Sequence, residues 1–425
     1  MTNYTKLEEE LNTIKYEEVG IGSLLALELF LLSSETYKKK NLKGYLVFMK
    51  IILRAFLTKI PVFLNKNILY YKSGDKNHHN QIFNSINSIS KGVILTGGTI
   101  DATINSSVFN INFKNYIELI KWKNNSYNKF KLILNRNGIE KNILSLYVDL
   151  LINLLRFNFW DAFFQRNKIK LLLGDYDRGN ASAPIFVAAK KYKTPSVVIQ
   201  HGVINPPYGY TPLIADIVFV WGKMQKKQYL ELGVTDERIV ITGTPIVSKI
   251  ATINKVKLNT KKNIVLAVNP IKKEYIKQQI DTFSQLAQKD NYNLYIKVHP
   301  SQNVSTVKKM LDNEFIKILS KDIKFSDFVN MCDVLVTHNS GLANECILNE
   351  IPVIILDNLP ISAGNGVELN TFCNVPLVNN VEQLNKQIIT IDKLVIKKEN
   401  LYYKTGLEAE KEIQKQILKI YKPVI

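Results

Sequence analysis

The sequence has few cysteines and no long hydrophobic run. Its 425 residues contain three cysteines, whose spacing matches neither a metal-binding motif nor a disulfide framework: Cys332, Cys346 and Cys373. The best apolar run, 21–32, is interrupted by Glu28 and is shorter than a membrane span. Residues 8–10 are all glutamate, where a signal peptide would need basic residues. We therefore expect a cytoplasmic protein in a reducing environment.

Acidic residues are also in deficit. There are 37 of them against 56 basic residues, a net charge of +19, which favours an anionic partner. Nucleic acid is not expected, because the surplus is mostly scattered lysine and no RNP-like pattern, zinc finger or arginine-rich helix is present. An acidic membrane surface is a candidate partner, since residues 45–69 interleave apolar and basic side chains in a pattern that fits an amphipathic interfacial helix. An ordinary core-facing helix explains that pattern equally well.

Strands alternate with helices in two successive blocks, which predicts an α/β protein with two doubly wound parallel sheets. A hydrophobic content of 46% suffices for two cores of ordinary size. We expect the following divisions: a mostly helical N-terminal region at 1–90, a first Rossmann-like domain at 91–250, a polar linker at 251–262, a second Rossmann-like domain at 263–395, and a C-terminal helix within 396–425.

The strands are expected where short β-branched or aliphatic runs precede loop residues. In the first block these runs are 93–95, 168–173, 196–200, 217–221 and 239–242. In the second block they are 263–268, 294–298, 315–319, 334–337 and 352–356. The clearest expected helices are 144–164, 272–288, 325–331, 341–349 and 408–419.

Three of the five histidines directly follow expected strands: His201, His299 and His338. In an open parallel sheet the carboxyl ends of the strands form the ligand crevice, so each of these side chains is placed to face it. A single histidine in such a place is usually structural. Three in one chain, followed by Gly, Pro or Asn-Ser-Gly, indicate a site.

A serine motif follows the expected strand 334–337. The chain passes through Asn339 and Ser340 directly into a helix that begins at Gly341. Backbone N–H groups and a hydroxyl at a helix N-terminus suit a phosphate. Glu345 lies about a turn further on, where a carboxylate can accept hydrogen bonds from ribose hydroxyls. The structural alternative is that Asn339 or Ser340 merely caps the helix and Glu345 favours its positive end.

A His-Pro motif follows the expected strand 294–298. His299 is fixed by the following Pro300 and lies beside Lys297. Such a histidine can donate to a phosphate or protonate a leaving oxyanion. The alternative is an ordinary turn with Pro300 as its breaker.

Both motifs lie in the second block, at the same edge of one expected sheet. This placement resembles the GT-B glycosyltransferases that carry a His-Pro motif and a serine motif in the C-terminal domain. Bacterial sialyltransferases, Kdo-type capsule transferases and the CDP-glycerol polymerases of teichoic acid synthesis look like this. The Gln200-His201-Gly202 segment and the run 215–222 also look like surface-polysaccharide members of the group. The resemblance covers roughly residues 165–360.

The resemblance implies a GT-B fold, in which two Rossmann-like domains face a central cleft, and a nucleotide-activated donor in the second domain. His299 and Ser340 would hold the donor phosphate, and Glu345 the ribose or base side. The donor-binding set implied in this way is Lys297, His299, Pro300, Asn339, Ser340, Gly341 and Glu345.

The first block is then expected to bind the acceptor, and inverting transfer needs a general base there. We rank Asp177 first, because it lies furthest into the loop that follows its strand. His201 is second, since its strand fixes it and histidine titrates near neutral pH. Asp175 is third, as the residue most suited to hold the loop. On the acceptor side we also expect Gly97, Gly98, Gln200 and Gly202.

Asp175 and Asp177 also form an Asp-x-Asp, which in GT-A enzymes holds a divalent metal. We discount this reading because the two-block layout contradicts GT-A, and we expect a metal-independent enzyme without a cofactor, in which protein donors replace the metal. The chain also lacks a clear paired acidic-Gly motif of the sialyltransferases.

The expected function is an inverting transfer from a nucleotide-activated sugar, with a CMP-activated acidic sugar favoured, to a glycan or lipid-linked acceptor. It would build a bacterial cell-surface polysaccharide, such as a capsule, at the inner face of the membrane. Three alternatives stay open: a CDP-glycerol or CDP-ribitol phosphotransferase, an enzyme like the UDP-sugar 2-epimerases, and a non-catalytic GT-B-like scaffold.

Overall fold

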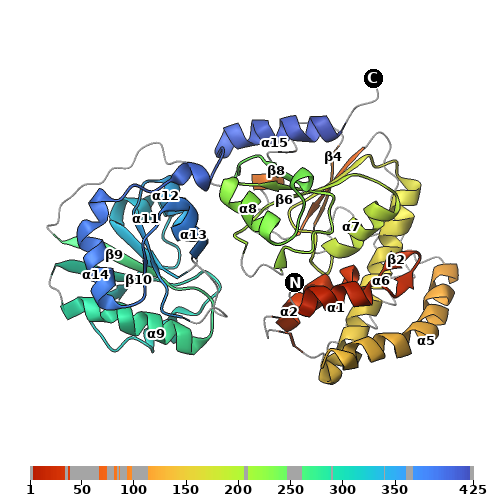
Figure 1. Ribbon diagram of the computed structural model, residues 1–425, viewed down its shortest axis with the longest axis horizontal. Helices are drawn as coiled ribbons and strands as arrows, with labels where there is room; N and C mark the ends of the chain where they lie inside the picture. Colours follow the sequence, from red (N-terminus) through yellow and green to blue (C-terminus); the bar gives the residue numbers. More distant parts are fainter. Residues whose placement is uncertain are drawn as a thin grey trace. The chain divides into compact units, whose positions relative to one another are not determined.

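The computed structural model forms two compact units, each built on a six-stranded parallel sheet (Figure 1). The first unit comprises Met1–Val220, Lys226–Ile246 and Leu407–Ile425, and the second comprises Trp221–Gln225 and Val247–Gly406. The expected α/β class with two parallel sheets is therefore confirmed. The structure describes residues 3–33, 37–38, 67–73, 81–83, 86, 93–97, 113–204, 209–246, 261–288, 291–338, 340–359 and 367–421.

The sheet of the first unit has the strand order β4-β3-β5-β6-β7-β8. Its strands are β3 (Ile68–Lys72), β4 (Val93–Gly97), β5 (Leu171–Gly174), β6 (Ser196–Ile199), β7 (Ile217–Val220) and β8 (Ile239–Ile241). From β3 the chain moves outward to β4 and then returns to the other side of β3. The order therefore reverses between β3 and β5, and the carboxyl ends of these two strands flank the topological switch point where ligands bind in such sheets.

Strand β3 lies in the N-terminal stretch that we expected to be mostly helical. Ile68 and Leu69 also belonged to the expected amphipathic helix at 45–69, so that expectation is wrong for these two residues. The run Ile-Leu-Tyr-Tyr is buried and rich in residues that favour strands, which explains its place inside the sheet. Residues 39–66 lie outside the described residues.

Alternate residues of β3 face opposite sides of the sheet and join different cores. Leu69 and Tyr71 pack with the helices of one face, where α6 (Ile143–Arg166) and α7 (Ser182–Lys191) lie. Ile68 and Tyr70 pack on the other face, which α15 (Gly406–Ile420) covers with Ile413 and Ile417. The C-terminal helix thereby belongs to the first unit (Figure 1).

The N-terminal segment of the first unit forms a small layer of its own. Its elements are α1 (Asn3–Leu11), the hairpin of β1 (Lys15–Tyr16) and β2 (Val19–Gly20), the short helix η1 (Ser23–Leu25) and α2 (Ala26–Ser33). It packs with α5 (Phe113–Arg136) and α6. Among the described residues one segment, Glu140–Arg166, is long and apolar enough to cross a membrane, but 83% of its apolar window is buried in the protein, as in a core helix.

The sheet of the second unit has the order β11-β10-β9-β12-β13-β14. Its strands are β9 (Lys262–Ala267), β10 (Tyr292–Lys297), β11 (Ile316–Ile318), β12 (Val334–Thr337), β13 (Val353–Leu356) and β14 (Leu377–Val378). Its helices are α9 (Lys273–Ser284), α10 (Val304–Lys308), α11 (Phe325–Met331), α12 (Gly341–Leu348), α13 (Val367–Cys373) and α14 (Val381–Thr390). This is the dinucleotide-binding order, with the switch point between β9 and β12.

The central strands of the second sheet are continuous apolar runs because helices cover both faces. All four residues of β12 and all four of β13 are buried. Strand β12 and helix α11 have the ends expected from the sequence, whereas β5 begins three residues later than expected. For these elements the sequence therefore predicts the type correctly, whereas the terminal residues can differ, because the local pattern is least informative at the ends.

Candidate functional site

The two motifs of the second unit meet at the carboxyl edge of its sheet. Lys297 is the last residue of β10, and His299 follows two positions later. Ser340 precedes α12, and three residues separate the end of β12 from the start of this helix. Because β10, β9 and β12 are neighbours in the sheet, these residues flank the switch point between β9 and β12.

His299 presents an N–H donor. Its Nδ1 lies 2.7 Å from Ser301 Oγ and accepts the backbone N–H of Ser301 at 3.2 Å. A ring nitrogen that accepts a hydrogen bond carries no proton, so the proton of the neutral ring is on Nε2. An Nε2–H group at the edge of the sheet suits a phosphate oxygen or a leaving group.

The loop that carries His299 is held from two sides. The backbone N–H of Gln302 donates to the carbonyl of His299 at 2.9 Å, which closes a turn around the exposed Pro300. The Gln302 side chain accepts from His299 N at 3.3 Å and donates to Asn269 O at 3.0 Å. The turn reading of Pro300 is therefore correct, and the turn fixes the histidine beside the loop that follows β9.

Ser340 caps α12. Its Oγ accepts the backbone N–H of Leu342 at 3.2 Å, which is the structural role foreseen as the alternative. The first turn of the helix still directs its dipole and the N–H of Gly341 toward the edge of the sheet. Asn339 lies outside the described residues. Phosphate binding here would thus depend on the helix end as a whole more than on the serine hydroxyl.

Lys297 and Glu345 interact electrostatically. Burial raises the pKa of the Glu345 carboxyl from its ordinary 4.5 to about 6, and the positive charge of Lys297 opposes the rise. Burial also lowers the pKa of Lys297, which Glu345 opposes, and the Lys297 ammonium lies 6.0 Å from the centre of the Phe328 ring. A lysine from the His-Pro strand and a carboxylate from the serine-motif helix therefore share one partly buried environment.

Tyr402 is a neighbour of Glu345 that the sequence did not indicate. Burial, followed by the charge of Glu345, raises the pKa of the Tyr402 phenol. Its ring centre lies 5.8 Å from that of Trp221, and the Trp221 carbonyl accepts the N–H of Tyr403 at 2.9 Å. A tyrosine pair between two helical segments carries no recognisable pattern, so only the fold reveals the place of Tyr402.

In the first unit, His201 follows β6 and has the opposite tautomer to His299. Its Nδ1 lies 2.5 Å from the carbonyl oxygen of Asp175. A carbonyl only accepts, so Nδ1 carries the proton and Nε2 has the lone pair. The rings of Tyr176 and Tyr210 pack at 5.5 Å and 6.1 Å from the His201 ring. A positioned imidazole with a basic Nε2 is what a general base requires.

Asp175 holds the switch point of the first sheet together. It is fully buried, and its Oδ1 accepts the N–H of Ser73, just after β3, at 2.9 Å. Its Oδ2 accepts from the Tyr70 hydroxyl at 3.4 Å. The carboxylate thus links the loops after β3 and β5, the supporting role we foresaw for the third-ranked candidate.

Asp177 does not extend out of its loop, and our reason for ranking it first is wrong. Its side chain is 2% exposed, and one carboxylate oxygen accepts the backbone N–H groups of Ile214 at 2.7 Å and Ala215 at 2.9 Å. Burial raises its pKa, whereas these hydrogen bonds and Arg178 oppose the rise. Through these two hydrogen bonds Asp177 anchors the segment before β7. His201 is then the first-ranked candidate for the general base.

The two carboxylates of the Asp-x-Asp accept hydrogen bonds from different backbone segments, Asp175 from Ser73 and Asp177 from residues 214 and 215. They therefore do not face a common point, as the ligands of a metal must. In the part of the chain that the structure describes, no three His, Cys, Asp or Glu side chains form a group able to hold a metal ion.

The other predicted acceptor-side residues have structural contacts. Gln200 is buried and donates to the Gly202 carbonyl at 2.8 Å. A Cβ at Gly202 would lie 3.1 Å from the Tyr210 hydroxyl, so the glycine lets the tyrosine approach. Gly97 ends β4 in register with Lys72, and Gly98 lies outside the described residues.

The third strand-end histidine is structural. His338 is fully buried, and its Nδ1 lies 3.2 Å from the Leu356 carbonyl at the end of β13 and 3.7 Å from Asp357.

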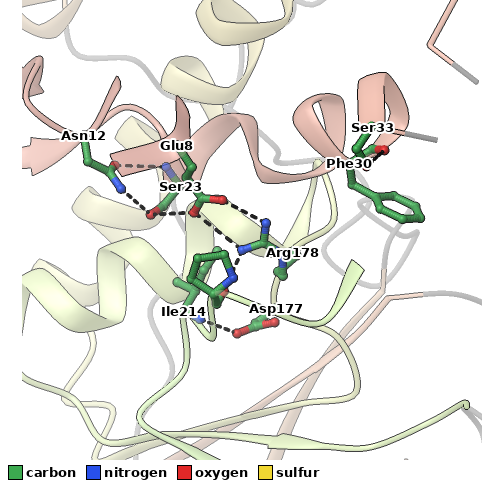
Figure 2. A network of polar contacts seen from close by, with 9 residues as sticks. Glu8, Asn12, Ser23, Phe30, Ser33, Asp177, Arg178 and Ile214 are labelled. Atoms are coloured by element: carbon green, nitrogen blue, oxygen red, sulfur yellow. Dashed lines mark hydrogen bonds and ion pairs between the residues drawn. The ribbon is translucent and has the colours of Figure 1, made fainter. Parts of the chain in front are cut away.

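A pocket of about 510 Å³ in the first unit contains none of the predicted site residues. It lies between α1, the β1–β2 hairpin, α7 and the loop 212–214. Its polar floor is made of side chains that bond to one another: Glu8, Asn12 and Ser23 (Figure 2). The predicted residues lie elsewhere, at the carboxyl edge of each sheet, and each edge is a candidate site of its own unit.

No family model matches the chain, and no curated protein matches it. Solved structures do. UDP-GlcNAc 2-epimerase from Neisseria meningitidis, bound to UDP-GlcNAc, is similar at 14% identity and a TM-score of 0.50 over 83% of this chain and 100% of the epimerase. The S. aureus MnaA–UDP structure follows at 16% identity, 84% and 98% coverage and a TM-score of 0.48. A glycosyltransferase from Rickettsia africae has 13% identity, 85% and 100% coverage and a TM-score of 0.47.

The likeness to the Neisseria enzyme shows the fold. Both units of this chain are parallel-sheet α/β domains, and the pair is GT-B-like.

Proposed function

We propose that this protein is an enzyme of nucleotide-activated sugars, and specifically a glycosyltransferase. The observation that carries the proposal is the meeting of Lys297, an N–H-donating His299 and the α12 N-terminus at the switch point of a sheet with dinucleotide-binding order. Three sources of positive charge or N–H donors at such a point suit a diphosphate or phosphodiester.

In this proposal the second unit binds the donor. His299 Nε2–H and Lys297 would stabilise the negative charge that develops on the leaving phosphate. Glu345, half-buried one turn into α12, would accept from the ribose hydroxyls. The residues that hold the donor can thus also assist its departure without a metal.

The first unit would bind the acceptor. His201 Nε2 would take the proton of the attacking hydroxyl, while Nδ1–H stays bonded to the Asp175 carbonyl. That bond also stabilises the imidazolium that forms. An attack from the face opposite the leaving nucleotide inverts the anomeric centre.

The finer assignment follows the resemblance to surface-polysaccharide enzymes. We propose a CMP-activated acidic sugar as donor, a glycan or lipid-linked acceptor, and assembly of a cell-surface polymer at the inner face of the membrane. The net charge of +19 supports an anionic partner such as an acidic lipid surface. A CDP-polyol donor would use the same phosphate contacts.

A 2-epimerase of UDP-sugars is the second candidate. The observation that favours it is the likeness to the Neisseria UDP-GlcNAc 2-epimerase, whose entire chain is covered by the structural alignment. An epimerase needs no acceptor. The same His299 and α12 groups would hold its nucleotide.

Thermal unfolding of the full chain with CMP, CDP or UDP tests the donor. A nucleotide that binds only the folded state raises the unfolding temperature, and at a hundred times its Kd the gain is about 2.7 kcal/mol. Stabilisation by CMP above the others supports the CMP-sugar. Stabilisation by CDP or UDP redirects the assignment to the polyol transferase or the epimerase.

Product analysis then separates the reactions. Epimerisation converts UDP-GlcNAc alone into its 2-epimer, which NMR detects, whereas transfer releases nucleotide only with an acceptor. A chain that binds no nucleotide and releases none would be the non-catalytic scaffold, and the proposal would be wrong.

A further inference from the structure

A buried ion pair connects the N-terminal helix to the loop after β5. Glu8 of α1 and Arg178 are 2.8 Å apart, and their side chains are 2% and 0% exposed. The partners lie 170 positions apart in the sequence, and Figure 2 shows them facing each other from α1 and from this loop. Replacing such a pair by apolar residues of similar volume is often neutral or stabilising, so the pair is weak evidence for stability and leaves room for a positioning role.

Each of the four residues 175–178 in the loop after β5 makes a different contact. The carbonyl of Asp175 accepts from His201, and the ring of Tyr176 packs against the His201 ring. Asp177 accepts from the N–H groups of residues 214 and 215. Arg178 binds Glu8. The residue that orients the candidate base is thus three positions from the residue held by the N-terminal helix.

The segment 209–212, whose Tyr210 packs against His201, is also contacted by Arg178 and by the N-terminal segment. Arg178 donates to the Pro212 carbonyl at 2.6 Å. A Cβ placed on Gly209 would lie 3.3 Å from the ring of Phe30, which belongs to α2. Tyr210, which follows Gly209, packs at 6.1 Å from the His201 ring. The loop that carries the Asp175 carbonyl and the segment that carries Tyr210 are therefore each in contact with residues 3–33.

We propose that Glu8 is a positioning residue for His201, acting through Arg178. The ion pair fixes the loop 175–178 so that the Asp175 carbonyl accepts the Nδ1–H of His201, which leaves Nε2 as the proton acceptor. The value of this arrangement to a reaction rests on the proposed function, but the arrangement itself is a property of the folded chain and is measurable without substrate.

The test is the tautomer of His201 in Glu8→Gln. Long-range ¹H–¹⁵N spectra of the histidine-labelled full chain distinguish Nδ1–H from Nε2–H rings, and the His201 signals are those lost in His201→Gln. We expect the wild type to show the Nδ1–H form at neutral pH. In Glu8→Gln the ratio of Nδ1–H to Nε2–H should fall roughly tenfold, the equivalent of one lost hydrogen bond.

Glu9→Gln is the matched control. It removes an exposed carboxylate from the neighbouring position of α1 and should leave the His201 signals unchanged. If Glu8→Gln is folded and keeps the wild-type tautomer ratio, the positioning role is wrong. An equal shift in Glu9→Gln would also overturn it, because the effect would then follow the charge of the helix.

Glu8→Gln leaves a buried guanidinium without its carboxylate and is at risk of unfolding. If its histidine signals are not dispersed, the double variant Glu8→Met/Arg178→Met decides, since it removes both charges together. A folded double variant with the wild-type tautomer overturns the proposal, and one with the altered tautomer supports it.

Kinetics separate this inference from the proposed function. If the wild type transfers a sugar, Glu8→Gln should lower kcat with little change in the donor KM. If the wild type has no transferase activity, the proposed function fails while the tautomer result still decides the role of Glu8.

Discussion

Lys297 and Glu345 hold opposite charges in one partly buried environment at the edge of the second sheet, and each opposes the effect of burial on the pKa of the other. One comes from the end of a strand and the other from the second turn of a helix that follows a different strand. Their meeting joins the His-Pro and serine motifs into a single site.

Replacing Glu345 tests this environment by its pH dependence. Because burial raises the pKa of Glu345 from 4.5 to about 6, the folded state binds the proton more tightly than the unfolded state. The folded state therefore loses stability as the pH rises from 4.5 through about 6, where the carboxyl ionises. Glu345→Gln should therefore be more stable than the wild type at pH 8, by about 1–2 kcal/mol. Denaturant unfolding at pH 4 and pH 8 measures this, and the gain should vanish at pH 4.

The same variant separates nucleotide binding from stability. If the ionised carboxylate accepts from the ribose, wild-type affinity for the nucleotide should fall as the pH drops below about 6. Calorimetric titration should show weaker binding in Glu345→Gln and no such pH dependence. Equal affinity of both proteins across this range would return Glu345 to a purely structural role.

His299→Ala should lower the transfer rate roughly 100-fold or more, the scale for losing a positioned acid or charge-stabilising donor. The fold should survive, because the side chain is only half-buried and bonds to Ser301 of its own turn. Steady-state kinetics beside a thermal melt measure both effects. Lys308→Ala, an exposed charge on the helix that follows, is the control. Near-normal activity of His299→Ala would refute the phosphate role.

Substitutions of His201 and Asp177 should have opposite consequences. His201→Gln should abolish most activity and keep the fold. Asp177→Ala should instead lower the free energy of unfolding by about 3 kcal/mol, because two buried N–H groups lose their acceptor. Urea unfolding with parallel activity assays checks the pair. A stable but inactive Asp177→Ala would restore Asp177 as the base.

Activity should persist in excess EDTA, because His299, Lys297 and the α12 N-terminus would supply the charge stabilisation that a metal gives elsewhere. Assays with and without chelator measure this. Complete loss with EDTA, reversed by added manganese or magnesium, would revive the metal reading of Asp175 and Asp177.

The sequence alone determined the class of fold and the edge of the second sheet at which the proposed donor-side residues lie. Alternating β-branched runs and helical segments set two parallel sheets, because buried parallel strands need continuous apolar runs that are visible locally. Residues at the ends of such runs and in the loops that follow must lie at the carboxyl edge of the sheet. The positions of Lys297, His299 and Ser340 at this edge could therefore be predicted from the sequence. The prediction of a mostly helical N-terminal region was wrong for β3, because the buried run of this strand directly follows a segment with a helical spacing of apolar residues.

Only the tertiary structure decided what each strand-end side chain does. Position in the sequence did not distinguish Asp177, buried against two N–H groups, from His201, whose Nε2 is basic. Nor did it link Glu8 to Arg178 or bring Tyr402 near Glu345. These relationships join residues far apart in the chain, and hydrogen bonding and burial depend on neighbours that only the folded chain supplies.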